Sequence, residues 1–297
     1  MASVQDLKRR IRSIRNTRKI TKAMELVASA RLRRAQARIE AMRPYADRMM
    51  ELMVGTARAS SSVRGLPLLQ RHEEERAVAI LPLTGDRGLA GAFNAQVLRH
   101  ALALDRQLRA DGKRVRWLAS GRKGVSTLRF RRYEIVQSWT GFSDRPSYHD
   151  AQALAHAVSE LYTSGEVDRV VIVYNHFVSP LVQQVTEQDV LPIPEQLLDA
   201  GEDAEQHAAL LGDFIYEPEP EQILERLLPV YVETELYRAL LESAASEQGA
   251  RMTAMRNASK NAGELIDSLT LAMNRARQAE ITQEILEVVA GADALTA

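Results

Sequence analysis

The stretch MTAMRNASKNAGELIDSLTLAMNRA, residues 252–276, carries small or apolar side chains at alternating steps of three and four. These positions are Met252, Met255, Ser259, Ala262, Ile266, Leu269, Met273 and Ala276. This spacing is the period of a left-handed coiled coil. Because residues 230–297 contain no proline, we expect the stretch to belong to one long helix.

A second proline-free stretch, residues 1–43, offers a matching stripe at the other end of the chain. Its apolar positions are Leu7, Ile11, Ile14 and, after a slip in register, Ile20, Met24, Val27 and Ala28. We therefore predict that the two terminal helices pair antiparallel. Many stripe residues are small, and Gly249 and Gly263 each cost roughly 1 kcal/mol relative to alanine, so the pair needs outside support.

Between these helices the pattern changes to short apolar runs that are typical of strands. They are RAVAILPL (76–83), KRVRWLA (113–119) and VDRVVIVYNHF (167–177), separated by segments with helical spacing. This alternation predicts a mostly parallel sheet covered by helices. The segment SPLVQQVTEQDVLPI (179–193) follows too closely for a crossover, so we expect an antiparallel edge strand.

We accordingly predict an α/β protein with three parts. They are an N-terminal coiled-coil helix and connector (1–75), an α/β domain (76–212), and a C-terminal helix that pairs with the first (213–297).

The sequence lacks the residue patterns of a self-contained enzyme. It has no cysteine, which excludes a disulfide, a thiolate nucleophile and a thiol-ligated metal. The Gly-rich TGDRGLAGAFN (84–94) has neither the Gly-Lys-Ser/Thr of a P-loop nor the dinucleotide spacing, and the six histidines are scattered. We predict no catalytic, cofactor-binding or metal-binding residue, and leave Asp86 and Arg87 as an exposed contact point.

Charge is distributed in blocks although Lys plus Arg and Asp plus Glu both number 39. Residues 1–48 hold fourteen basic and four acidic residues, and residues 187–247 hold sixteen acidic and two basic residues. Such patterning indicates macromolecular partners. The basic helix alone would suit DNA or an anionic membrane, and it is also typical of a mitochondrial leader. It has no aromatic residue before Tyr45 to stack on bases. A nucleotide-dependent enzyme is a further alternative, because the central segment has an α/β pattern and the glycine-rich stretch 84–94.

Four blocks of the sequence resemble the gamma subunits of F-type ATP synthases, and the resemblance covers essentially the whole chain. They are RIRSIRNTRKITKAMELVASARLRRAQ (10–36), DRGLAGAFN (86–94), YEPEPEQIL (216–224), and the C-terminal segment from Ser246 to Leu295. The resemblance implies a Rossmann-like α/β domain and a helix that begins near Val4, as in mature bacterial subunits, rather than a leader. Ala90 stands where relatives often have cysteine, which removes thiol regulation.

The resemblance also implies a rotor shaft that is not catalytic by itself and has no cofactor. Its expected partners are three alpha and three beta subunits, the epsilon subunit and the c-subunit ring, on the cytoplasmic side of a bacterial membrane and without nucleic acid. A polar catch for a beta-subunit loop would comprise Arg277, Gln278 and Thr282. The beta-subunit levers would pass Lys22, Met24, Arg33 and Arg34. An apolar bearing tip would comprise Ile285, Leu286, Val288 and Val289. Contacts to the rotor ring and epsilon would include Phe214, Tyr216 and Glu217.

Overall fold

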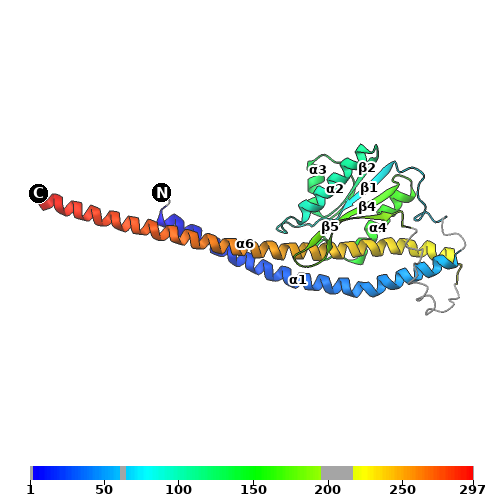
Figure 1. Ribbon diagram of the computed structural model, residues 1–297, viewed down its shortest axis with the longest axis horizontal. Helices are drawn as coiled ribbons and strands as arrows, with labels where there is room; N and C mark the ends of the chain where they lie inside the picture. Colours follow the sequence, from blue (N-terminus) through cyan, green and yellow to red (C-terminus); the bar gives the residue numbers. More distant parts are fainter. Residues whose placement is uncertain (1–2, 61–64, 195–216, 297) are drawn as a thin grey trace. The chain divides into compact units, whose positions relative to one another are not determined.

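The computed structural model describes residues 3–60, 65–194 and 217–296, with side chains to residue 290. The chain forms two compact units. The helix-pair unit comprises Met1–Ala28 with Arg251–Ala297, and the α/β unit comprises Ser29–Ala250. Helices α1 (Val4–Ala59) and α6 (Pro220–Thr296) contribute to both units (Figure 1). Among the described residues, none of the helices has the length and apolarity to span a membrane.

The α/β unit is built on a five-stranded sheet with the order β3-β2-β1-β4-β5. The strands are β1 (Ala77–Pro82), β2 (Arg114–Ser120), β3 (Ile135–Trp139), β4 (Arg169–Phe177) and β5 (Gln183–Leu191). Strands β1 to β4 pair parallel, whereas β5 pairs antiparallel with β4. The predicted α/β fold and its antiparallel edge strand are therefore confirmed.

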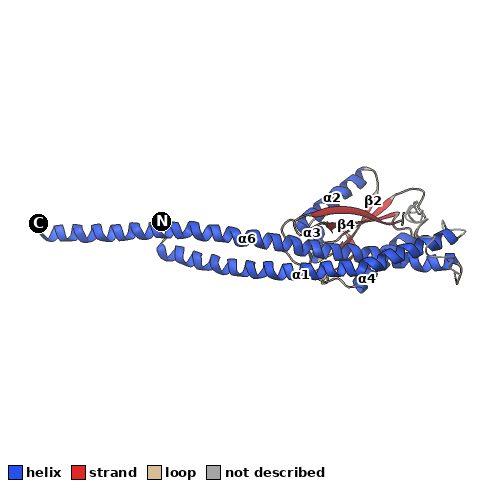
Figure 2. Ribbon diagram, turned by 60° about the horizontal axis from the view of Figure 1, so that its bottom comes forward, coloured by secondary structure: helices blue, strands red, loops and turns tan. Residues whose placement is uncertain are grey.

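Helices cover both faces of this sheet (Figure 2). Strand β1 is buried throughout, with Ala77, Ala79 and Leu81 in the core beneath α1, α4 (Tyr148–Thr163) and α6. Val78 and Ile80 enter the opposite core beneath α2 (Phe93–Ala110) and α3 (Arg122–Phe130). Burial on both faces explains why this strand is a continuous apolar run rather than an alternating one.

Strand β3 and helix α3 were absent from the sequence-based description. Strand β3 has only five residues, none with a buried side chain. Helix α3 contains a glycine and three Lys or Arg within its nine residues, and two more arginines follow it directly. Both terminal helices also exceed the proline-free stretches, because α1 continues through Pro44 and α6 begins before Pro229. Burial of Met53, Leu228 and their neighbours outweighs the roughly 3 kcal/mol that an internal proline costs.

Helices α2, α3 and α4 end in the same hydrogen-bonded motif, in which a residue of positive φ follows the last turn. Gly112 (φ 79°) and Gly165 (φ 75°) occupy this position after α2 and α4, but Arg132 (φ 63°) occupies it after α3. The Arg132 N–H donates to Arg129 O at 2.9 Å and the Tyr133 N–H to Leu128 O at 3.0 Å. An arginine therefore stands where glycine is favoured.

Replacing Arg132 by glycine is expected to raise the free energy of unfolding by about 0.5–1 kcal/mol. The left-handed conformation destabilises a residue that has a side chain by about 1–2 kcal/mol in the folded chain. Glycine avoids this strain, but its greater conformational freedom stabilises the unfolded chain and offsets part of the effect. Urea unfolding of Arg132→Gly measures the effect. Gly112→Ala is the reciprocal control, since a Cβ there meets nothing within 4 Å. Equal stability of both variants and the wild type would contradict this assignment.

The helix-pair unit is an antiparallel pair, as predicted. Thr21 Oγ1 lies 2.7 Å from Ser259 Oγ, and Arg256 Nε donates to Glu25 Oε1 at 3.1 Å, so the paired numbers run in opposite directions. On α6 the predicted stripe is confirmed, with Met252, Met255, Ser259 and Ile266 buried and the rest partly buried.

Beyond Ile14 the predicted α1 stripe was wrong at Ile20 and Val27, whereas Ala28 is buried and Met24 partly buried as predicted. Ile20 and Val27 are 60% and 52% exposed, whereas Thr21, Glu25 and Ala28 are buried. The regular step of seven from Ile14 leads to Thr21 and Ala28, so the helix keeps its period and accepts polar residues in the seam. Lys22 and Arg256 hold the pKa of Glu25 below its ordinary value despite burial. The seam is thus paired by polar contacts as well as packing.

Candidate functional site

The carboxyl ends of β1 and β4 form the position where open α/β sheets bind nucleotides, because the chain order reverses there. Here α6 fills that position. Leu240, Ser243, Ala244 and Glu247 face Leu83, Thr84 and Ser120 around a cavity of only about 10 Å³. A Cβ on Gly85 would lie 2.8 Å from Glu247 Oε2, which shows how closely the helix approaches. Ligand pockets usually span about 300–1,000 Å³, so this space does not admit a nucleotide.

Asp86 organises the loops at the same edge of the sheet rather than forming an exposed contact point. Its carboxylate accepts the N–H groups of Arg122 (2.9 Å), Gly141 (2.8 Å) and Ser143 (3.1 Å). Partial burial opposes ionisation, but these three donors hold the pKa of Asp86 below its ordinary value. The loops after β1, β2 and β3 are therefore joined through one carboxylate.

Replacing Asp86 by asparagine is expected to lower the free energy of unfolding by about 2 kcal/mol at neutral pH, because hydrogen bonds to a charged acceptor are lost. The pKa is lower in the folded chain, so ionised Asp86 stabilises above about pH 4 and this contribution disappears as the pH falls through the folded pKa. Chemical unfolding from pH 7 to pH 3 measures it. Asp111→Asn, at an exposed helix end, is the control. A difference that grows towards acid pH would contradict this role.

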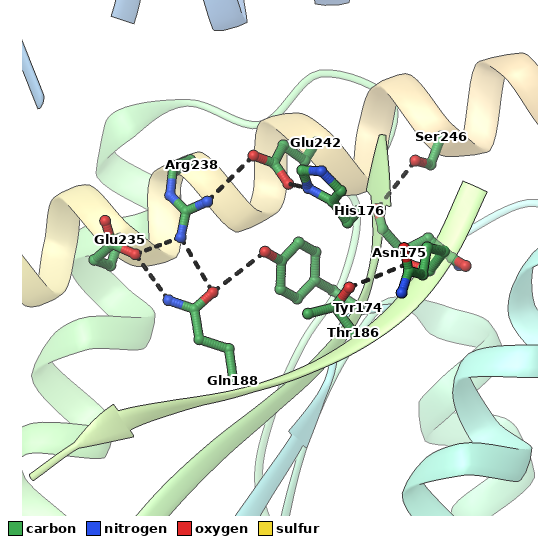
Figure 3. Close-up of polar contacts among 10 residues, drawn as sticks. Tyr174, Asn175, His176, Thr186, Gln188, Glu235, Arg238, Glu242 and Ser246 are labelled. Carbon is green, nitrogen blue, oxygen red and sulfur yellow. Dashed lines mark hydrogen bonds and ion pairs between the residues drawn. The ribbon is translucent and has the colours of Figure 1, made fainter. Parts of the chain in front are cut away.

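A polar network that the sequence reasoning missed fixes α6 to strands β4 and β5 (Figure 3). Arg238 Nη2 donates to Glu235 Oε2 at 2.6 Å and to Gln188 Oε1 at 3.1 Å, and Nη1 donates to Glu242 Oε1 at 3.3 Å. Gln188 Nε2 donates to Glu235 at 2.8 Å, and the Tyr174 hydroxyl donates to Gln188 Oε1 at 3.2 Å. The guanidinium group thus links two carboxylates on its own helix to the sheet.

The network continues one turn further along α6. His176 Nδ1 lies 2.5 Å from Glu242 Oε2, and Ser246 Oγ donates to the Asn175 carbonyl at 3.0 Å (Figure 3). Burial and the Glu242 charge raise the pKa of Tyr174 to about 12, so its hydroxyl remains a donor near neutral pH. The acid–base–acid spacing of Glu235, Arg238 and Glu242 on one helix face was the available sequence signal. It was not recognised because their partners on the sheet are distant in sequence.

The three predicted catch residues lie on α6 near the point where its pairing with α1 ends. Continuing the register set by Thr21 with Ser259, the start of α1 at Val4 reaches α6 near Arg277. Arg277, Gln278 and Thr282 are exposed, and the Thr282 hydroxyl donates to the Gln278 carbonyl at 2.9 Å. In the described residues Arg277 makes no ion pair, so its guanidinium group is free to bind a partner.

Beyond the catch residues the predicted bearing tip is a run of exposed apolar side chains on α6. Ile285, Leu286, Val288 and Val289 are 50–72% exposed. A contiguous exposed apolar surface of this kind indicates an interaction site.

The residues predicted to contact the beta-subunit levers and the rotor ring differ in exposure. Lys22 is exposed and paired with Glu25 at 3.0 Å, Met24 is partly buried, and Arg33 and Arg34 are exposed. Glu217 is exposed, whereas Phe214 and Tyr216 lie outside the described residues. Across the described ranges, no group of three His, Cys, Asp or Glu side chains is arranged to hold a metal ion.

Comparison with known proteins assigns the chain to a family. The family model described as ATP synthase matches residues 3–295. Proteins named ATP synthase gamma chain from Rubrobacter xylanophilus and Moorella thermoacetica are 48% and 47% identical to it, over 100% and 99% of this chain and 100% of each relative. The chain belongs to the ATP synthase gamma-chain family.

Solved structures agree with this membership. A chain of the Tetrahymena thermophila mitochondrial ATP synthase, described as central stalk and c-ring, has a TM-score of 0.58 and 28% identity, covering 81% of this chain and 99% of that one. A chain from the Euglena gracilis mitochondrial ATP synthase has a TM-score of 0.67 over 98% of this chain and 94% of that one. At 18% identity the second similarity shows the fold alone.

Proposed function

We propose that this chain is the central rotor shaft of an F-type ATP synthase, which couples rotation of a membrane ring to ATP synthesis or hydrolysis on beta subunits. The observation that carries the proposal is gamma-chain membership over nearly the whole chain, together with the antiparallel pair whose α6 continues past α1. The chain itself is not catalytic. The filled position at the sheet edge supports this role, because no nucleotide crevice remains there.

The proposed assembly has three alpha and three beta subunits around the helix pair, with epsilon and the c-subunit ring at the α/β unit. The complex lies at the cytoplasmic face of a bacterial membrane, and this chain is peripheral to it. Glu217, with Phe214 and Tyr216, contributes to the contact with epsilon and the ring.

The bearing tip turns inside an apolar sleeve of the alpha and beta subunits. Complete burial of its four large side chains would contribute roughly 6 kcal/mol, at about 1.5 kcal/mol each. Apolar contact has no preferred angle, so it holds the shaft without stopping it. The sleeve also supplies the outside support that a seam of small residues needs.

Coupling follows from the unequal faces of the shaft. Each beta subunit meets a different face and adopts the conformation which its contacts favour, so rotation moves the three states around the ring. The basic residues Lys22, Arg33 and Arg34, with Met24, pass the acidic levers, where charge attraction maintains contact without fixing register. The network around Arg238 carries force between the sheet and α6.

The double variant Arg277→Ala, Gln278→Ala is expected to lower ATP turnover of the assembled complex about tenfold. Arginine suits bidentate contact with a carboxylate, and a hydrogen bond to a charged group contributes about 1.5–3 kcal/mol. The measurement is ATPase activity of complexes purified with each variant, at equal subunit content.

The matched control is Gln283→Ala, an exposed position on α6 that lies about 140° around the helix from Gln278 and outside the bearing tip. This control is expected to retain wild-type turnover. Turnover that is unchanged by the Arg277 and Gln278 substitutions, or reduced equally by the control, would remove the catch assignment.

A further inference from the structure

A block of unbalanced positive charge surrounds helix α3. Residues 112–133 contain eight Lys or Arg and no Asp or Glu, in a chain whose total charges cancel. Two of the eight are neutralised, because Lys113 pairs with Glu75 at 2.7 Å and Arg116 pairs with Glu166 at 2.9 Å. Of the six that remain, three arginines lie within four residues of one another where α3 ends.

The end of α3 forms what we call the α3 tip, the four exposed residues Arg129, Phe130, Arg131 and Arg132. Within the described parts of the chain, none of these three guanidinium groups forms an ion pair. A cation in the last turn is favoured by the helix dipole, which accounts for Arg129. It does not account for Arg132, which keeps its charge at a left-handed position that α2 and α4 fill with glycine.

Phe130 has no structural reason for its exposure. The apolar contact that usually accompanies this type of helix C-terminus is made by Leu128 and Tyr133, which both pack in the core beneath α3. The Phe130 ring is instead 87% exposed between Arg129 and Arg131. An aromatic ring flanked by unpaired cations fits a surface that is anionic outside and apolar just below, which is the chemistry of a phospholipid headgroup layer.

We propose that the α3 tip docks on anionic phospholipid headgroups, with the arginines on phosphate and Phe130 at the boundary with the acyl chains. A planar lipid surface suits a tip of four residues, whereas a stable protein interface needs about 1,000 Å². Single-stranded nucleic acid is bound through grooves with several aromatic platforms, and the tip offers a single ring. This inference does not depend on the rotor function.

The experiment uses the full-length chain with vesicles of phosphatidylcholine, with or without phosphatidylglycerol. Total binding does not suffice, because the basic α1 helix also attracts anionic vesicles. We therefore place the probe at the tip with Phe130→Trp and measure quenching by lipids brominated on their acyl chains. The native Trp117 is buried and Trp139 partly buried, so the wild-type chain supplies the background. Leu181→Trp is the matched control, exposed to 70% in a segment without charges.

The proposal predicts quenching above background for Phe130→Trp on phosphatidylglycerol vesicles and none for Leu181→Trp. Changing Arg129, Arg131 and Arg132 to glutamine in the Phe130→Trp chain should weaken the quenching-detected affinity about a hundredfold, as three surface cations are lost. Circular dichroism verifies that the variant is folded. Absence of extra quenching at residue 130, equal quenching at residue 181, or persistence without the arginines would each overturn the proposal.

Discussion

Replacing Arg238 by alanine is expected to lower the free energy of unfolding by about 3 kcal/mol. Among the residues that the structure describes, Arg238 is the one cation paired with Glu235, and its loss leaves Glu242, whose side chain is 8% exposed, with His176 as its remaining ion-pair partner. Breaking a buried ion pair from one side costs about 3–5 kcal/mol, because a charge remains in a poorly solvated position. The lower end applies here, since a third of the arginine side chain reaches solvent.

Urea unfolding followed by circular dichroism measures this effect. Arg226→Ala is the matched control, because Arg226 lies exposed on the same helix and makes no ion pair with the described residues. Its stability should remain within about 0.5 kcal/mol of the wild type. If both variants were equally stable, the network would not hold α6 to the sheet, and the route proposed for force transmission would be lost.

Replacing Gly121 by alanine is expected to have the second large effect, a loss of about 4 kcal/mol. Gly121 has φ 91°, and a Cβ there would lie 1.9 Å from the Thr84 carbonyl oxygen. The variant is destabilised by backbone strain at a positive φ and also by the steric clash, which forces apart the loops after β1 and β2. The closely packed edge beside α6 would open.

Gly141→Ala separates these two costs. Gly141 has φ 102°, but a Cβ there meets nothing within 4 Å. This control should therefore lose only the conformational part, about 1–2 kcal/mol. Thermal unfolding of both variants gives the comparison, and equal losses would contradict close packing at Gly121.

Periodicity in the sequence predicted the elements whose environment is uniform. The α6 stripe from Met252 to Ile266 and the buried runs of β1 and β4 were confirmed, because one repeated side-chain pattern faces one kind of neighbour throughout. Short elements were missed for the opposite reason. Strand β3 has five residues at a sheet edge, where burial imposes no clear pattern.

Contacts between distant polar residues were not predictable from one sequence. Thr21 and Glu25 lie in the α1 seam because Ser259 and Arg256 face them, and neither partner is visible from the N-terminal stretch alone. The apolar residues Ile20 and Val27 drew the predicted register away from the true one. The roles of the bearing tip and of the catch residues were inferred from the family resemblance, and the partners of both remain a prediction.

The most direct test of the rotor account is to observe rotation. The chain has no native cysteine, so His156→Cys on the exposed face of α4 provides a unique attachment point for a bead. The variant would be co-expressed with the alpha and beta subunits of its own source, and the complex fixed to a surface through the beta subunits. We predict that the bead turns in one direction when ATP is added and stops when ATP is removed. Steady ATP hydrolysis with a bead that shows only random motion would contradict the central claim.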